Sequence, residues 1–341
     1  MSSVMRPAAL PAQAGARAFD VFNGDADGIC ALHQLRLIFP RDAELVTGVK
    51  RDVSLLQRVP RCANADVTVL DVSLDANAEP LRRILDSGGN VMYFDHHCNR
   101  QAFAHPRLYF VWSDAPDVCT SILVDRHLQG RFRPWAIVAA FGDNLPVAAC
   151  ALARDLGLDE RRIRALDELG RVLNYNAYGE QVEDLHIAPQ ALYRALAPFV
   201  DPFDFIEASP RLRELVDGYR SDAARIASVT PEYDFAGGVV YILPCAPWAR
   251  RISGVFANAL AASGTARSCA VLTEKSDGTF VVSVRSAQPE QRSASALCTR
   301  FRTGGGRRTA AGINALPAEE LREFVNAFAA YFEDAGGAHA C

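Results

Sequence analysis

Four short clusters of aspartate, histidine and asparagine follow apolar segments within the first 145 residues of the chain. They are Asn23-Gly24-Asp25-Ala26-Asp27-Gly28, Asp71, Asp95-His96-His97 and Gly142-Asp143-Asn144. A single aspartate after a strand is commonly a helix cap or a turn residue. Four clusters in succession, each at the end of a hydrophobic segment, indicate one shared metal site.

Carboxylates combined with imidazole favour manganese or a similar transition metal over calcium. Two divalent ions would bring four positive charges to balance four aspartates, which are Asp25, Asp27, Asp71 and Asp143. A pair of ions of this kind turns water into hydroxide near neutral pH and holds an attacked phosphate. The clusters therefore predict metal-dependent phosphate chemistry.

The first cluster also resembles the start of a calcium-binding EF-hand loop. Such a loop needs Glu eleven positions after its first ligand and a helix before it. Here that position is Gln34, and residues 19–22, Phe-Asp-Val-Phe, are strand-like. The calcium interpretation is therefore disfavoured. At an extended strand end, Asp25 and Asp27 are expected to lean to the same side.

The segments that must position these clusters alternate between strand and helix patterns. Strands are expected at Ala18–Phe22, Asp66–Val72, Val91–Phe94 and Leu108–Trp112, and helices at Ile29–Phe39 and Glu79–Asp86. Trp135–Phe141, before Asp143, fits a buried helix or a strand. The alternation predicts an α/β protein with a doubly wound, mainly parallel sheet. Such sheets bind ligands beyond the carboxyl ends of strands, where the first three clusters lie.

A mostly helical stretch with breaks at four prolines precedes a second set of elements; the prolines are Pro189, Pro198, Pro202 and Pro210. Strands are then expected at Gly238–Leu243, Ser268–Thr273 and Thr279–Arg285, with an Asp277-Gly278 hairpin turn, and helices at Ile252–Ala262, Ala294–Phe301 and Ala318–Phe332. We therefore divide the chain into a flexible tail (1–17), a metal-binding domain (18–200), a helical linker (201–233) and a second, smaller α/β domain (234–335).

Charge is unevenly distributed along the chain. Residues 235–315 contain ten Lys and Arg against three Asp and Glu, whereas the whole chain has a formal net charge of −4. A basic C-terminal segment on an acidic body predicts that anions are bound mainly by the C-terminal part. Long nucleic acid bound without sequence preference is disfavoured as the main partner, because it needs an extended basic track.

Composition also bears on location. No stretch approaches 18 uninterrupted apolar residues, and residues 1–17 lack the apolar core of a signal peptide. The nine cysteines are scattered without a Cys-x-x-Cys pair, which fits a reducing compartment. We therefore expect a cytoplasmic protein with no membrane partner.

The four clusters, in this order, resemble the motifs of the DHH phosphoesterase superfamily, whose name comes from the tripeptide present here as Asp95-His96-His97. The C-terminal half resembles the DHH-associated domain. Ser283-Val284-Arg285-Ser286 matches its Arg-Ser strand, and Gly304-Gly305-Gly306-Arg307-Arg308-Thr309-Ala310-Ala311-Gly312 matches its glycine-rich signature. The resemblance extends from about residue 18 to 330, and six motifs in order make it specific.

The resemblance implies two divalent metal ions, with manganese expected and magnesium or cobalt as alternatives. One ion would be bound by Asp25 and Asp71, with the amide oxygen of Asn23 as a weaker ligand. The other would be bound by Asp27, Asp71, His96 and Asp143, so that Asp71 bridges the two ions. Asp95 would orient a ligand, and His97 would lie near the phosphate that is cleaved.

The resemblance also implies an active site in the cleft between the two domains, with the basic domain closing over the substrate. Arg285 would stabilise charge on the phosphate. Phosphate or the terminal nucleotide would be bound by Arg285, Ser286, Gly304, Gly305, Gly306, Arg307 and Arg308.

Two positions depart from the family pattern. Asn23 stands where members usually carry His or Asp, and a neutral amide predicts looser binding of the first ion. Arg307 stands where the glycine signature usually continues with His. Arginine keeps a cationic donor suited to phosphate but cannot titrate near neutrality, so this change bears on the substrate more than on the reaction.

We therefore expect a manganese-dependent phosphodiesterase of the nano-RNase or oligoribonuclease kind. It would hydrolyse short linear RNA or DNA oligonucleotides or dinucleotides to mononucleotides through metal-activated water. The alternatives within this class are a RecJ-like single-strand exonuclease, a 3′,5′-bisphosphate nucleotide phosphatase and a cyclic-dinucleotide phosphodiesterase. The alternative outside it is a nucleotide-binding protein with impaired catalysis. Family members are often dimers, so a homodimer is compatible with the resemblance.

Overall fold

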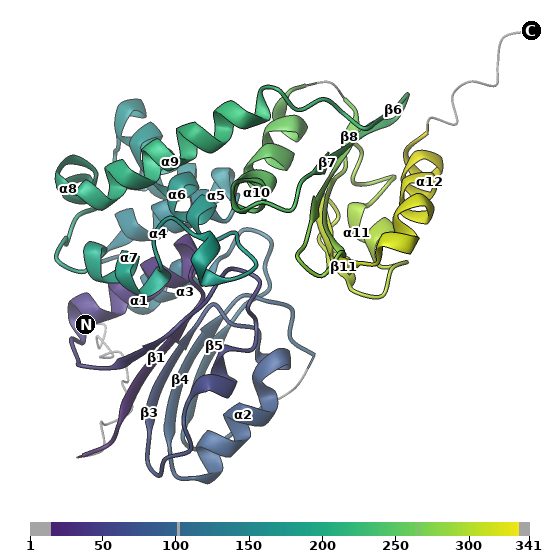
Figure 1. Cartoon of the computed structure of the whole chain (residues 1–341). Coiled ribbons are helices and arrows are strands. Elements are labelled where there is room, and N and C mark those ends of the chain that lie inside the picture. The colour runs from purple at the N-terminus through teal and green to yellow at the C-terminus, as the bar shows by residue number, and fades with distance from the viewer. Residues whose placement is uncertain (1–14, 101–102, 265, 334–341) are drawn as a thin grey trace, which may run out of the picture. The chain divides into compact units, whose positions relative to one another are not determined.

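Five apolar segments of the N-terminal half pair into one parallel sheet (Figure 1). They are β1 (Ala18–Phe22), β2 (Glu44–Val46), β3 (Asp66–Leu70), β4 (Asn90–Asp95) and β5 (Leu108–Trp112), in the spatial order β2-β1-β3-β4-β5. The computed structural model describes residues 15–100, 103–264 and 266–333. Most of the predicted tail (residues 1–14) and the end of the predicted C-terminal domain (334 and 335) lie outside these ranges.

Helices cover both faces of this sheet, as expected for strands that are nearly continuous apolar runs. The helix α2 (Leu74–Asp86) and the short 3-10 helix η1 (Leu55–Arg58) pack with Phe19, Val67 and Tyr93 on one face. The helix α1 (Ala26–Ile38) belongs to the opposite face, where its Arg36 binds Asp20. The doubly wound α/β prediction is therefore confirmed.

Further helices complete the N-terminal unit. They are α3 (Thr120–His127), α4 (Arg133–Gly142), α5 (Pro146–Asp155), α6 (Glu160–Asn176), η2 (Val182–Asp184), α7 (Pro189–Leu196) and α8 (Pro202–Ala208). The helix α9 (Pro210–Ile226) begins in this unit and continues past its end at Asp217. Three of the predicted proline breaks, at Pro189, Pro202 and Pro210, are the first residues of helices, where proline loses no intrahelical hydrogen bond. The segment Trp135–Phe141 is part of α4 and is buried.

The chain divides into two compact units, Met1–Asp217 and Gly218–Cys341. The second unit contains a six-stranded sheet in the order β10-β11-β9-β8-β7-β6, in which only β7 and β8 are parallel neighbours. Its strands are β6 (Tyr233–Phe235), β7 (Gly238–Leu243), β8 (Ser268–Glu274), β9 (Phe280–Arg285), β10 (Gly304–Gly306) and β11 (Ala310–Leu316).

Helices cover this second sheet as well. The helix α10 (Pro247–Ala262) packs on Leu243 and Val271, whereas α11 (Ala294–Cys298) and α12 (Leu321–Phe332), which follows the 3-10 helix η3 (Ala318–Glu320), belong to a core with Val282. No helix in the described ranges is both long enough and apolar enough for a membrane span.

The strands β2, β6, β10 and β11 were not expected from the sequence. The strands β2 and β6 have three residues each, too few for alternation to be recognised. The strand β10 consists of three glycines, a residue type that is depleted in strands. Sheet pairing, rather than local preference, therefore creates these elements.

The close crossing of α4 and α6 depends on Gly170, so the stability of the protein should be sensitive to any side chain added at this position. A Cβ at this position would lie 2.2 Å from the carbonyl oxygen of Val138 and 2.9 Å from the nitrogen of Gly142. We expect Gly170→Ala to lower the free energy of unfolding by about 1–3 kcal/mol, because overpacking outweighs the gain in helix propensity. Urea denaturation would measure this. The matched change Glu168→Ala, on the exposed side of α6, should have little effect, and equal stability of the two variants would contradict the prediction.

Candidate metal centre

The carboxyl ends of three neighbouring strands bring most of the predicted ligands to one edge of the parallel sheet. Strand β1 leads to Asn23, Asp25 and Asp27, and β3 leads to Asp71, while β4 ends in Asp95 and leads to His96 and His97. The chain winds to opposite sides of the sheet after β1 and β3, so this edge is the switch point at which doubly wound sheets bind ligands.

Asp143 reaches the same edge from a helix rather than a strand. It caps the C-terminal end of α4. Its Oδ2 atom lies 3.6 Å from Nε2 of His96. The same histidine nitrogen lies 3.3 Å from Oδ1 of Asp71 and 3.8 Å from Oδ2 of Asp27. Three carboxylates from distant parts of the sequence thus surround one imidazole nitrogen.

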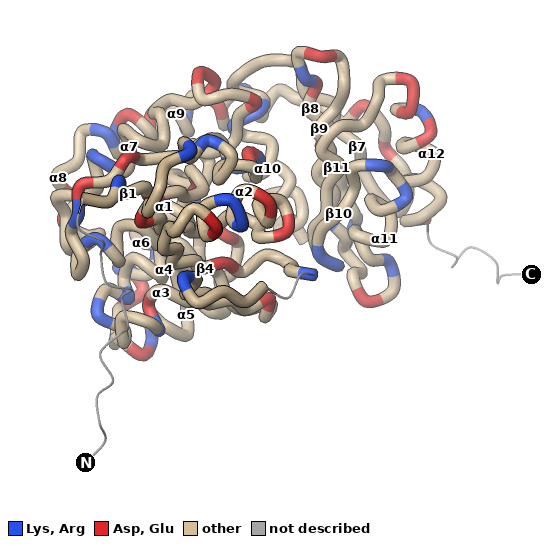
Figure 2. Tube along the Cα trace, turned by 90° about the horizontal axis from the view of Figure 1, so that it is seen from below, with Lys and Arg blue, Asp and Glu red and all other residues tan. Residues whose placement is uncertain are grey.

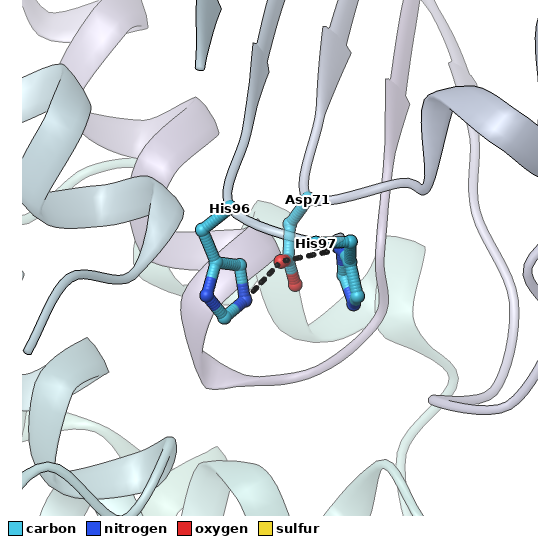
Figure 3. A group of neighbouring side chains, drawn as sticks. All are labelled: Asp71, His96 and His97. Carbon is cyan, nitrogen blue, oxygen red and sulfur yellow. Dashed lines mark ion pairs between the residues drawn. The ribbon is translucent and has the colours of Figure 1, made fainter. Parts of the chain in front are cut away.

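The orientation of His96 is fixed by its other ring nitrogen. Nδ1 lies 3.1 Å from the carbonyl oxygen of Val118, which can only accept a hydrogen bond, so Nδ1 carries a proton. Nε2 is thereby directed toward Asp71 (Figure 3). A backbone carbonyl on one nitrogen and ligand capacity on the other is the usual arrangement of a metal-binding histidine.

Asp27 and Asp71 are held in place by the start of α3. The two carboxylate oxygens of Asp27 accept hydrogen bonds of 2.7 Å from the backbone nitrogens of Thr120 and Ser121. Oδ1 of Asp71 accepts one of 3.2 Å from the hydroxyl of Thr120. Asp71 also has a positive φ of 59°, a conformation that is uncommon for non-glycine residues and in which Asp and Asn are enriched.

Asp95 orients the two histidines through hydrogen bonds. It is completely buried, and its Oδ1 accepts hydrogen bonds from the backbone nitrogens of His96 (2.9 Å) and His97 (3.2 Å) and from Nδ1 of His97 (2.7 Å). His97 is the more accessible histidine, with 38% of its side chain exposed. Asp95 therefore sets the direction of the His97 ring and leaves Nε2 of that ring for another partner.

The concentration of negative charge perturbs the protonation of these groups. Burial lowers the pKa of His96, but its hydrogen bond to Asp71 and the charges of Asp143 and Asp27 outweigh burial and raise this pKa to about 10. Burial raises the pKa of Asp71 well above its usual range, and it raises that of Asp27 as well. Without a metal ion, the cluster therefore retains protons at neutral pH that a cation would displace.

Two groups of side chains in the described ranges are close enough to hold a metal ion. They are Asp27, His96 and Asp143, and Asp71, His96 and His97. The predicted ligands Asp27, Asp71, His96 and Asp143 are thus brought together, and their metal-binding role remains a prediction. Asn23 and Asp25 belong to neither group.

Asn23 and Asp25 have other partners. The amide nitrogen of Asn23 donates to the carbonyl of Lys50 (3.2 Å), and its oxygen accepts from the nitrogen of Asp25 (3.3 Å). Asp25 caps α1, since its Oδ1 accepts from the nitrogens of Asp27 (2.9 Å) and Gly28 (3.1 Å). Because α1 begins at Ala26, Asp25 caps a helix and Asp27 lies in its first turn, and the two residues do not both lie on an extended strand end as expected.

Lys50 and Asn174 were not anticipated from the sequence. The Nζ atom of Lys50 forms an ion pair with Oδ2 of Asp25, lies 3.3 Å from Oδ1 of Asp143 and donates to Oδ1 of Asn174 at 2.9 Å. Burial lowers the pKa of Lys50, but Asp25 and Asp143 outweigh it and raise this pKa well above its usual value. The sequence did contain one signal that could have drawn attention to Lys50. It is one of only two lysines, with Lys275, among 36 basic residues.

The predicted substrate-binding residues lie together in the second unit, where β9, β11 and β10 are neighbours. Arg285 ends β9, and its Nε donates to Oδ1 of Asn258 in α10 (2.8 Å). The hydroxyl of Ser286 donates to the carbonyl of Arg292 (2.6 Å). Basic stretches lie beside β10 and α11 (Figure 2). Arg307 is exposed, and Arg308 pairs with Glu290 at 3.0 Å.

The three glycines Gly304, Gly305 and Gly306 form β10. A Cβ on Gly304 would lie 1.8 Å from the carbonyl oxygen of Cys298, and Gly306 has a φ of 136°. Both positions therefore exclude a side chain for packing or conformational reasons. A Cβ on Gly305 would meet nothing within 4 Å, so its exposed backbone is open to a ligand.

No protein-family model and no curated protein sequence matches the chain, but solved structures match most of its length. The DHH domain of a member of a ribosomal-protein family has a TM-score of 0.62 and 14% identity, with 93% of this chain and 86% of that chain covered. The exonuclease RecJ bound to manganese has a TM-score of 0.57 and 19% identity, with 93% and 90% covered. The chain has the DHH fold.

A third similar structure is the pGpG-specific phosphodiesterase PggH from Vibrio cholerae. It has a TM-score of 0.51 and 15% identity, with 92% of this chain and 98% of that chain covered. The resemblance read from the sequence motifs is therefore confirmed at the level of the fold, and the clusters that carried it occupy one edge of the DHH sheet.

Protonation of His96 predicts how pH affects the stability of the metal-free protein. Folded His96 keeps its proton up to a pKa of about 10, whereas the reference value for the unfolded side chain is 6.5. The folded state therefore binds more protons between these limits. Its free energy of unfolding should fall as the pH rises from 6.5 to about 10.

Urea denaturation in EDTA would measure this slope. His96→Gln should make it shallower, whereas the matched change His105→Gln, at a histidine that belongs to neither group of possible metal ligands, should not. Added manganese should reduce this fall in stability with pH. The ion displaces the proton on His96 and binds more tightly as the pH rises. A slope that is the same with and without His96 would rule out this assignment of the proton.

Proposed function

We propose that the chain is a metal-dependent phosphodiesterase that hydrolyses short linear oligonucleotides or dinucleotides to mononucleotides. The observation that carries this proposal is the group of Asp27, Asp71 and Asp143 around Nε2 of His96. This group lies on a fold shared with the exonuclease RecJ and the pGpG-specific phosphodiesterase PggH. Phosphodiester hydrolysis is the chemistry that the names of these two proteins have in common.

The donor set of this group suits a divalent ion. Three carboxylates and one imidazole nitrogen are ligands that manganese accepts, with magnesium and cobalt as alternatives. The raised pKa of His96 reflects how strongly the cluster attracts positive charge to the atom that would bind the ion. When bound, such an ion would acidify a water molecule and polarise a phosphate oxygen.

We assign the remaining roles to residues that are already oriented. Asp95 fixes Nδ1 of His97, so Nε2 of His97 is available to donate a hydrogen bond to a phosphate oxygen when the ring is protonated. In the second unit, Arg285 and Ser286, with the β10 glycines and Arg307 and Arg308, would bind phosphate or the terminal nucleotide. The exposed backbone of Gly305 is open to a phosphate group.

A short substrate is favoured by charge. The ten basic residues between 235 and 315 are confined to part of the chain, and an extended basic track is what long strands require.

A RecJ-like single-strand exonuclease is the second candidate, because RecJ has the higher TM-score of the two phosphodiester-cleaving relatives. All eight cysteines in the described ranges are free, which supports a cytoplasmic location.

The central test is release of mononucleotides from pGpG by the purified full-length protein with manganese. Asp71→Ala should lower kcat/KM by at least about 100-fold, because loss even of outer residues at metal sites costs about 10- to 100-fold. The control Asp155→Ala, at the exposed end of α5, should retain activity. EDTA should abolish turnover, and manganese should restore it.

A series of labelled oligonucleotides separates the two candidates. Faster cleavage of the shortest members supports the dinucleotide or oligonucleotide assignment, whereas faster cleavage of the longest supports the RecJ-like one. No turnover of any member, together with identical melting of the metal-free and manganese-treated protein, would refute a metal-dependent phosphodiesterase.

A substitution of Arg285 tests whether the second unit binds the substrate. Arg285→Met should reduce kcat/KM by roughly 10- to 100-fold, because a hydrogen bond to a charged group contributes about 1.5–3 kcal/mol. Arg322→Met, an exposed change of the same kind on α12, is the control. An Arg285→Met protein with native melting and undiminished kcat/KM would exclude Arg285 from substrate binding.

A further inference from the structure

The ammonium group of Lys50 contacts Asp25, which the DHH resemblance assigns to the first of two metal ions, and Asp143, which it assigns to the second. Lys50 follows β2, and only 23% of its side chain is exposed. Its Nζ atom contacts oxygens of Asp25, Asp143 and Asn174. Three oxygen atoms from separate elements around one small cation are the surroundings expected of a bound metal ion.

Two of the three groups assigned to the first ion, Asn23 and Asp25, already have other partners. Oδ1 of Asp25 accepts from two backbone nitrogens at the start of α1, and its Oδ2 accepts from Lys50. The amide of Asn23 is also engaged at both ends, with Lys50 and Asp25 as its partners. A divalent ion at this position would have to displace these contacts and would lie beside the positive charge of Lys50. The residues therefore do not fit a metal ion there.

The second position is different. Asp143 turns its Oδ1 toward Lys50 and its Oδ2 toward His96, so one carboxylate separates the two positively charged sites. The carboxylates around Nε2 of His96 are those of Asp27, Asp71 and Asp143. This is the position at which the group Asp27, His96 and Asp143 could hold an ion.

We infer that the ammonium group of Lys50 occupies the place of one of the two divalent ions, so that the chain binds a single ion at His96. The inference rests on the proposed metal-binding function. Lysine suits this place better than arginine, because an ammonium is a compact point charge with three donors, matching the three oxygens present. An ammonium neutralises carboxylates and donates hydrogen bonds, but it does not coordinate water.

The stoichiometry of metal binding tests this inference in the full-length protein. Metal-free protein would be titrated with manganese by calorimetry, and the bound ion would be examined by electron paramagnetic resonance. One ion per chain, with the spectrum of an isolated manganese, is the expected result. Two ions per chain with a coupled spectrum would overturn the inference but leave the proposed function standing. No bound ion would overturn both.

Removal of the Lys50 ammonium group tests whether this group is what excludes a second ion. Lys50→Met should raise the stoichiometry from one to two manganese ions, since Asp25 and Asp143 are then left without their cation. The control is Lys275→Met, which changes the other lysine of the chain and should leave one ion bound. A folded Lys50→Met protein that still binds one ion would show that Lys50 does not hold this place. If the variant does not fold, the count for the unaltered protein decides the question.

Discussion

The carboxylates of Asp25, Asp27, Asp71 and Asp143 are gathered at one edge of the parallel sheet, and three of them are almost completely buried. Two like charges 4 Å apart repel by about 4 kcal/mol at an effective dielectric constant of about 20. A few such pairs rival the whole stability of a domain, roughly 5–15 kcal/mol. Each carboxylate must therefore be matched by a cation or by hydrogen-bond donors, and the elements around this edge supply both.

Helix N-termini supply the donors. Asp25 accepts from the first turn of α1, and both oxygens of Asp27 accept from the first residues of α3. The unpaired backbone nitrogens and the dipole at a helix N-terminus stabilise a negative charge. In a doubly wound sheet, helices begin near the carboxyl ends of strands. The fold thus provides anion-stabilising groups at the same edge where it collects the aspartates.

Positive charge at this edge comes from two kinds of source. Lys50 is fixed by the chain and neutralises the side formed by Asp25 and Asp143. The other side, around His96, holds a proton in the absence of metal and has the donor set of an exchangeable ion. Asp143 contacts both sides. The proposed single-ion site would thus combine a covalently attached cation, Lys50, with one exchangeable ion.

The sequence by itself determined the alternation of strands and helices, the DHH fold and the presence of acidic and histidine clusters after the strands, because apolar periodicity and strand ends are local properties. Tertiary structure decided which atoms meet. Lys50 is 25, 93 and 124 positions from its partners Asp25, Asp143 and Asn174. It follows β2, a strand of three residues that forms only by pairing with β1. Asp25 caps a helix and Asp27 lies in its first turn, because that helix starts between them. Contacts between residues so distant along the chain depend on packing, which no local pattern encodes.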